Sequence, residues 1–488
     1  MKILLNLMLV GLLFTACQNK KNDKKQEQNT NRRNPNIIYI LADDLGYGDL
    51  SCYGQTKFST PNIDKLASQG MLFTQHYSGS TVCAPSRSSL MTGMHTGHTV
   101  VRGNKEIQPE GQYPIPDSTF TVAEVLKEKG YVTGAFGKWG LGFPGSEGDP
   151  TKQGFDRFFG YNCQRLGHHY YPDHLWSDND SIIIEGNKGF NKEIYTPKLI
   201  HEKTLEFIET NKDDPFFLYV ASIIPHAELV APEEDLKKYR GEYLPEKKYK
   251  GVDDGPKYRK GPYASQNESH AAYVAMVSIL DHQVGEIMEK VKELGIEDNT
   301  LIIFTSDNGP HQEGGADPKY FNSNGVLKGF KRDLYEGGIR VPMIARWTGQ
   351  IEPNTTSDHI SAFWDVFPTF CDLSGVSIPN NIDGISFLPT LVKDTTNQKK
   401  HEYLYWEFHE KGGRQAIRKG KWKAVKYDVF KNPETPLELY DLSKDIKEEN
   451  NVAKENPMVV KEMEMIFEKA RTDSEVFNFS QETYLNIK

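Results

Sequence analysis

The chain has 488 residues, of which 37% are hydrophobic and 26% charged, and it includes 24 Tyr and 25 Phe. This length and composition predict a soluble globular protein with one large domain and a smaller companion. The formal net charge of −9 excludes a general affinity for nucleic acid, so an anionic substrate needs a local basic pocket.

The first residues form a targeting signal. An apolar run at residues 3–16 is too short to span a bilayer and has the length of a signal-peptide core. The sequence Leu-Phe-Thr-Ala-Cys at residues 13–17 resembles a bacterial lipobox, with Phe14 where Leu is usual. We expect residues 1–17 to be a lipoprotein-type signal peptide, with a secretory signal cut elsewhere as the alternative. Residues 18–34 are polar and basic and predict a disordered tether.

The first strand is expected at residues 36–42, a short apolar run typical of buried parallel strands. Thr60 and Pro61 then indicate the start of a helix, and Gly70 its end. Similar signals predict helices at residues 122–129, 199–211 and 270–294, and strands at residues 131–136, 216–224 and 300–306. This alternation predicts an α/β fold with a large, mostly parallel sheet flanked by helices on both faces.

Two long stretches, residues 163–197 and 227–268, read as insertions that either shape a substrate pocket or form solvated connections. The pattern changes beyond residue 394. Short segments at residues 415–418, 422–425 and 438–440 predict a small antiparallel sheet, and residues 457–471 an amphipathic helix packed against it. We expect a main domain at residues 35–394 and a smaller C-terminal α+β subdomain at residues 395–488.

Cys83 is the most informative of the cysteines. It begins the string Cys-Ala-Pro-Ser-Arg, which continues as Ser-Ser-Leu-Met-Thr-Gly to residue 93. Pro85 predicts that a helix starts here, where free N–H groups and the helix dipole favour an anion. A buried structural cysteine and a thiol nucleophile of low pKa are the alternatives. Neither Cys-x-x-Cys pairs nor a disulfide ladder are formed by the five cysteines, Cys17, Cys52, Cys83, Cys163 and Cys371.

Polar pairs follow two of the predicted strands. Asp43 and Asp44 come after the first strand, and Asp307 and Asn308 follow the strand at residues 300–306. In open α/β sheets, ligands bind beyond the carboxyl ends of the strands. Four oxygen-bearing side chains at that edge suit a hard cation such as calcium, although Asp and Asn also commonly cap helices and turns. We predict a metal site there.

Together these motifs resemble those of the type I sulfatases, a family in the alkaline-phosphatase-like superfamily. Cys-x-Pro-x-Arg followed by a short helix and Thr-Gly is similar to the family's maturation motif, in which the cysteine is oxidised to formylglycine (3-oxoalanine) and the arginine, here Arg87, holds the modified side chain. The resemblance extends from about Asn36 to Asn451. It implies that the main domain is catalytic. It also implies a Ca²⁺ ion with the ligands Asp43, Asp44, Asp307, Asn308 and the modified Cys83.

Three further positions match the family. Gly-Lys-Trp at residues 137–139 resembles a motif whose lysine, here Lys138, contacts sulfate. His226, after Pro225, resembles the histidine that faces the leaving oxygen. Lys331, five residues before Glu-Gly-Gly-Ile-Arg-Val-Pro, stands where the family has a second sulfate-binding lysine. The strings at residues 383–389 and 439–442 also match.

One position departs from the pattern. The family commonly reads Gly-Lys-Trp-His-Leu-Gly, whereas this chain has Gly140 in place of the histidine. That histidine is thought to help deprotonate the formylglycine diol during sulfate release. His168, His169, His311 or water are the candidates for this function.

The resemblance implies a sulfuric ester hydrolase of the arylsulfatase or carbohydrate sulfatase type, and exported proteins with aromatic and basic loops suit a sulfated carbohydrate. The alternatives are a phosphodiester or phosphonate monoester hydrolase of the same fold, and a catalytically inactive, lipid-anchored glycan-binding protein, which Gly140 favours. The implied catalytic residues are Cys83, Arg87, Lys138, His226 and Lys331. Candidate substrate residues are Arg102, Asn104, Arg165, His168, His169 and His311.

The expected partners follow from these inferences. They are a sulfated glycan, a formylglycine-generating maturation enzyme and a membrane reached through a lipid on Cys17, with no nucleic acid. The expected location is the periplasm or the cell surface of a bacterium.

Overall fold

The computed structural model describes residues 34–482. The predicted signal peptide, the lipid on Cys17 and all but the last residue of the tether lie outside the described residues. Within residues 34–482, no helix has the length and hydropathy needed to cross a membrane.

A large sheet of eleven strands forms the centre of the fold. Its middle is parallel, as predicted, and antiparallel strands extend it at both sides. The parallel strands are, in order across the sheet, β10 (Thr300–Ser306), β1 (Asn36–Ala42), β9 (Phe216–Ala221), β5 (Val132–Lys138) and β6 (Arg157–Tyr161). Beyond β10 follow β11 (Arg340–Arg346) and β2 (Met71–Tyr77), with β12 (Thr355–Ser357) and β13 (Ser361–Ala362) paired to β2; beyond β6 follow β7 (His174–Ser177) and β8 (Asp180–Ile183).

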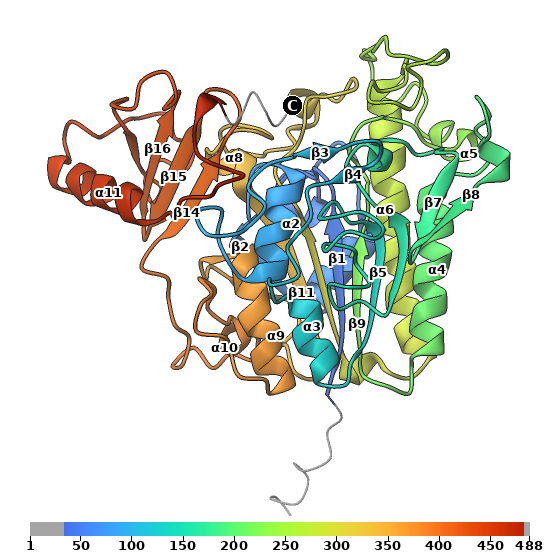
Figure 1. The fold of residues 1–488 in the computed structure, drawn as a ribbon, viewed down its shortest axis with the longest axis horizontal. Coiled ribbons are helices and arrows are strands. Elements are labelled where there is room, and N and C mark those ends of the chain that lie inside the picture. Colours follow the sequence, from blue (N-terminus) through green and yellow to red (C-terminus); the bar gives the residue numbers. More distant parts are fainter. Residues whose placement is uncertain (1–33, 483–488) are drawn as a thin grey trace, which may run out of the picture. The chain divides into compact units, whose positions relative to one another are not determined.

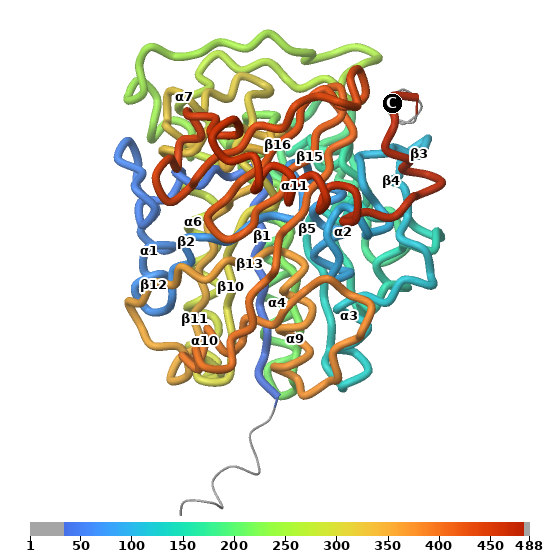
Figure 2. Tube along the Cα trace, turned by 90° about the vertical axis from the view of Figure 1, so that its left-hand side faces the viewer, coloured from blue at the N-terminus to red at the C-terminus, as the bar shows by residue number. Residues whose placement is uncertain are grey.

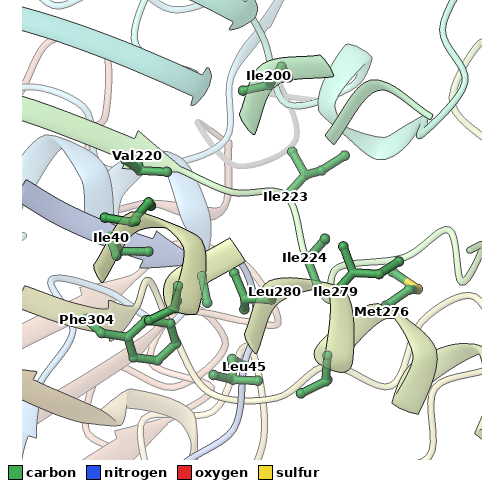
Figure 3. Close-up of a cluster of buried hydrophobic side chains, with 14 of the residues drawn as sticks. Ile40, Leu45, Ile200, Val220, Ile223, Ile224, Met276, Ile279, Leu280 and Phe304 are labelled. Atoms are coloured by element: carbon green, nitrogen blue, oxygen red, sulfur yellow. The ribbon is translucent and has the colours of Figure 1, made fainter. Parts of the chain in front are cut away.

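Helices cover both faces of this sheet (Figure 1). Side chains alternate along β1, so Ile38 and Ile40 pack in one hydrophobic cluster while Ile37 and Tyr39 pack in the other. Figure 3 shows part of the first cluster, around Ile40 and Leu280. That cluster includes side chains of α1 (Pro61–Ser68), α4 (Thr196–Thr210) and α6 (Ser269–Glu293), and the second includes side chains of α2 (Cys83–Thr92), α3 (Val122–Glu128) and α9 (Val366–Ser374).

The predicted antiparallel sheet near the C-terminus is confirmed, and it has one strand more than expected. Helix α11 (Pro457–Lys469) packs on it through Met463 and Phe467, which join Ile417 and Leu439 in one hydrophobic cluster. In Figure 2 these C-terminal elements face the viewer. The four strands are β14 (Leu404–Phe408), β15 (Arg414–Lys419), β16 (Trp422–Tyr427) and β17 (Glu438–Asp441). Short elements in the connections are β3 (Glu106–Ile107), β4 (Gly111–Gln112), α5 (Glu233–Leu236), α7 (Pro318–Phe321), α8 (Glu336–Ile339) and α10 (Leu388–Leu391).

A buried charge cluster joins β14 to the segment after α2. The carboxylate of Glu407 receives a hydrogen bond from Arg471 at 2.9 Å, lies 2.9 Å from His409 Nε2 and pairs with Arg102 at 3.4 Å. Arg102 also donates to the carbonyl of Thr472 at 2.8 Å. Burial by itself raises the pKa of Glu407, but the hydrogen bond with His409 and the charges of His409 and the two arginines outweigh it and lower the pKa to about 2.

This cluster leads to a prediction about acid stability. Because the pKa of Glu407 is lower in the folded state, its carboxylate stabilises the fold above the unfolded pKa near 4.5. This stabilisation is lost as the pH falls toward 2, and the pKa shift corresponds to about 3 kcal/mol of folding free energy. We expect Glu407→Gln to be less stable than the wild type at pH 7, and the difference to shrink below about pH 4.5. Urea unfolding from pH 7 to pH 3 measures it, with the exposed Glu402→Gln as control. If the difference in unfolding free energy between the wild type and Glu407→Gln instead grows as the pH falls, the depressed pKa of Glu407 is contradicted.

Candidate active site

The two polar pairs meet at one edge of the sheet. Strands β1 and β10 pair in parallel from Asn36↔Thr300 to Ala42↔Ser306, so both chains leave the sheet side by side. The backbone N–H of Asp44 donates to Asp307 Oδ1 at 3.1 Å, and Asn308 Nδ2 donates to Asp44 Oδ1 at 2.6 Å. All four polar side chains after the strands are fully buried. Four oxygen-bearing side chains therefore converge in a protected position.

Cys83 lies beside this group at the start of α2, the helix that the sequence predicted. Its Sγ is 3.2 Å from Asp43 Oδ1 and 3.5 Å from Lys138 Nζ. Burial raises the pKa of the Cys83 thiol well above its usual value, and the charge of Asp43 adds to the effect. The unmodified side chain is thus a protonated thiol, which weighs against the thiolate nucleophile considered above.

Arg87 follows Cys83 by one helical turn and locks the acidic group in place. Its guanidinium donates to Asp307 Oδ2 from Nη2 at 2.9 Å and from Nε at 3.2 Å, and Nη1 donates to the carbonyl of Lys138 at 2.6 Å. The guanidinium is fully buried. This charge-assisted contact, in which two donors share one carboxylate oxygen, fixes the helix start relative to the ends of β10 and β5.

Two lysines bring positive charge to the same point. Lys138 Nζ lies 2.6 Å from Asp43 Oδ2 at the end of β5, and Lys331 Nζ lies 2.8 Å from Asp44 Oδ2. Burial opposes the charge of Asp43, but its cationic neighbours, Lys138 first, keep its pKa well below the usual value. Burial and the negative charge of Asp43 instead raise the pKa of Asp307 to about 7. The site is a dense mixture of opposite charges.

His226 completes this centre after the end of β9. Its Nε2 lies 3.0 Å from Lys331 Nζ and 3.3 Å from Asp44 Oδ2, while Nδ1 contacts the carbonyl of Ala227. The ring is stacked between His168, with centroids 4.6 Å apart, and His311, at 5.5 Å. Burial and the charge of Lys331 lower the pKa of His226 well below its usual value. The neutral ring therefore carries its proton on Nδ1 and accepts at Nε2.

A pocket of about 170 Å³ opens above these groups. Residues from both predicted insertions reach it, His168 from residues 163–197 and Tyr263 from residues 227–268, so these stretches shape the pocket. Its lining consists of Cys83, Asn104, Glu106, Gln112, Gln164, Arg165, His168, His226, Tyr263, Glu313, Lys331 and Arg332.

The candidate substrate residues divide into two groups. Asn104, Arg165 and His168 line the pocket. His311 is buried behind it, with Nε2 3.1 Å from the carbonyl of Pro225. His169 pairs with Glu228 at 3.5 Å, and Arg102 belongs to the Glu407 cluster. Neither His169 nor Arg102 lines the pocket, because each has a buried carboxylate partner that turns it aside.

Several pocket residues were not predicted from the sequence. Glu313 is the most notable, since its carboxylate lies 3.5 Å from Lys331 Nζ, 2.5 Å from Arg332 Nη1 and 3.1 Å from the hydroxyl of Tyr263. The sequence feature that could have indicated Glu313 is its place six residues after Asp307, in the loop that follows β10. Gln112 and Gln164 carried no comparable signal.

The sequence matches two family models. One, described as Sulfatase, matches residues 35–376, and the other, described as N-sulphoglucosamine sulphohydrolase, C-terminal, matches residues 329–473. The chain belongs to the sulfatase family. Its members hydrolyse sulfate esters, and the protein is accordingly a sulfuric ester hydrolase.

Relatives and solved structures agree with this assignment. The sulfatase is 32% identical to the N-acetylgalactosamine-6-O-sulfatase of Bacteroides thetaiotaomicron, over 95% of this chain and 98% of the relative. It is 33% identical to human arylsulfatase A, over 86% of this chain and 83% of the relative. The crystal structure of Ps i-CgsB in complex with k-i-k-neocarrahexaose superimposes with a TM-score of 0.75 at 30% identity, covering 93% of this chain and 97% of that one.

Proposed function

We propose that this sulfatase removes sulfate esters from a sulfated carbohydrate, with a nucleophile made by oxidation of Cys83 to formylglycine and with a bound calcium ion. The observation that carries the proposal is the position of Cys83, at a helix start between Asp43 and Lys138 in a pocket that also contains Lys331 and His226. Similarity to an N-acetylgalactosamine-6-O-sulfatase and to a protein crystallised with a carrahexaose supports a carbohydrate substrate.

The acidic residues fit a calcium ion. Asp43, Asp44, Asp307 and Asn308 offer the carboxylate and amide oxygens that calcium prefers. Asn308 Oδ1 is buried and has no hydrogen-bond partner among the described residues, as expected for an oxygen directed at a ligand. Burial and, after it, the negative charge of Asp43 raise the pKa of Asp307, and a bound cation would favour its charged form. When bound, calcium would supply positive charge that polarises the sulfuryl oxygens.

The protein's own side chains stabilise charge, orient the nucleophile and transfer a proton. Lys138 and Lys331 aim ammonium groups at the place where the sulfuryl oxygens would lie and stabilise the charge that develops on them. Arg87 orients the side chain at position 83. His226 is placed to protonate the leaving sugar oxygen from Nε2. An incoming sulfate group adds negative charge beside the ring, which raises the pKa of His226 toward the protonated form that this role needs.

A substrate comparison tests the function. We expect protein purified from its native host to release sulfate from at least one member of a panel of sulfated sugars, including N-acetylgalactosamine 6-sulfate and sulfated carrageenan oligosaccharides. We expect kcat/KM for that substrate to exceed kcat/KM for an aryl phosphate diester by about 10³-fold or more, since the diester carries a second organic group and offers one free oxygen fewer to the two lysines and calcium. A preference for the phosphodiester would replace the proposal by phosphodiesterase activity, and binding of the sugars without turnover would favour the inactive glycan-binding protein.

We also propose that the protein is exported and held at a bacterial membrane by a lipid on Cys17. The lipobox-like sequence at residues 13–17 and the short apolar core before it support this proposal. The location is consistent with an extracellular or periplasmic glycan substrate. Mass spectrometry of the mature N-terminus tests it: a lipidated N-terminal cysteine supports the anchor, and an unmodified N-terminus at another position contradicts it.

A further inference from the structure

Three side-chain amides, those of Asn104, Gln112 and Gln164, line the active-site pocket. Asn104 Oδ1 accepts from the backbone N–H of Ala84 at 3.0 Å, and Gln112 Oε1 accepts from the backbone N–H of Gln164 at 3.3 Å. These contacts orient both amides and leave their NH₂ groups without a hydrogen bond to any other residue in the described part of the chain.

Gln164 is the most unusual of these three amides. Its side chain is only 6% exposed, yet within residues 34–482 neither Oε1 nor Nε2 has a hydrogen-bond partner. Buried amides in folded proteins are nearly always hydrogen-bonded, because leaving them unpaired is costly. An unpaired donor and acceptor at the lining of a substrate pocket therefore indicate a partner supplied by a ligand.

Gly140 makes the position of Gln164 possible. Gly140 has φ of +79°, and a Cβ atom placed on it would lie 2.1 Å from Gln164 Nε2. No side chain at position 140 is compatible with this placement of the amide, and the backbone conformation itself favours glycine. The glycine that departs from the family motif and the unpaired glutamine are thus two parts of one arrangement.

Charged side chains line the same pocket. Lys331 and Arg332 pair with Glu313, and Arg165 pairs with Glu106 at 3.0 Å. Ionic groups of this kind serve an anion, whereas a carboxamide, which both donates and accepts, matches a hydroxyl group, which does the same. The pocket therefore offers ionic groups for the sulfate and uncharged amides for a hydroxyl of the group next to it.

We propose that Gln164, supported by Asn104 and Gln112, binds an uncharged hydroxyl group of the sugar residue that carries the sulfate ester, and so helps to determine which sugar is accepted. This inference rests on the proposed function. Since a site that hydrogen-bonds a hydroxyl discriminates strongly against loss of that contact, the amide is expected to act on selection of the sugar and not on binding of the sulfate.

The test replaces Gln164 by methionine, which keeps the volume and removes the amide. The matched control is Gln283→Met, because Gln283 is also a buried glutamine but lies on α6, where its Nε2 donates to the carbonyl of Pro197 at 3.1 Å. Two constants are measured for each protein: kcat/KM for the best sulfated sugar of the panel, and the inhibition constant of inorganic sulfate. Thermal unfolding establishes that each variant is folded.

We expect Gln164→Met to lower kcat/KM for the sugar by about 10- to 100-fold while the inhibition constant of inorganic sulfate changes less than about 3-fold, and Gln283→Met to leave both unchanged. If Gln164→Met fails to fold, Gln164→Leu, which is also uncharged and lacks the amide, replaces it with the same expected split. Unchanged sugar turnover, or an equal loss for sugar and inorganic sulfate, overturns the inference. If the wild type cleaves no sulfated sugar, the carbohydrate function itself fails, which is a separate and recognisable result.

Discussion

Cys83→Ala is expected to reduce sulfate release by at least about 10⁴-fold, to the level of the uncatalysed background. In the proposed reaction the side chain at position 83 forms the bond to sulfur, and no neighbouring group can take over that role. Lys138, Lys331 and Arg87 are cationic, and the carboxylates beside them are held by these cations. A colorimetric assay of sulfate release measures the effect.

The control for this variant is Cys371→Ala, which removes a buried cysteine of α9 that packs in the second hydrophobic cluster and does not line the pocket. It should retain activity near the wild-type level. Retention of wild-type sulfate release by Cys83→Ala would end the covalent scheme. The mass of the wild-type peptide that contains residue 83 gives an independent test: formylglycine or its hydrate supports the proposed nucleophile, and plain cysteine throughout contradicts it.

The fold could be predicted where the local pattern was strong. Strands β1 and β10 have the predicted bounds because each is a continuous apolar run that stays buried on both faces. Strand β2 was missed because it carries polar residues such as Gln75 in a segment that is only partly buried. Strand β14 was missed because Glu407 interrupts its apolar pattern, and the buried partners of that carboxylate come from distant segments.

In the active site, too, some residues could be predicted from the local sequence, whereas others depend on contacts between distant segments. Asp43 and Asp307 could be placed together from the sequence because a parallel sheet brings the ends of its strands to one edge. Arg102 was expected at the substrate and lies instead in the Glu407 cluster, since its partner sits on a strand that the sequence did not reveal. Gln164 could not be identified from local pattern, because its significance depends on the space left by Gly140, which only the folded chain defines.

Removal of the proposed calcium ion is expected to have an effect second only to loss of Cys83. The four side chains at the sheet edge include three fully buried carboxylates, and burial together with the negative charge of Asp43 raises the pKa of Asp307 to about 7. We therefore expect protein treated with a calcium chelator to lose about 10³-fold or more of its activity, and its thermal midpoint to fall by a few °C because a ligand that binds only the folded state stabilises it.

Added calcium should restore both the activity and the thermal midpoint. Magnesium should restore them poorly, since it demands a smaller, octahedral site and gives up its waters reluctantly. Asn308→Ala provides the matched test, because it removes the unpaired amide oxygen without changing the charge of the site. This variant should need a higher calcium concentration for the same thermal midpoint. Activity and thermal midpoint that are both indifferent to chelation would instead mean that Lys138, Lys331 and Arg87 alone balance the carboxylates, as their ion pairs already do in part.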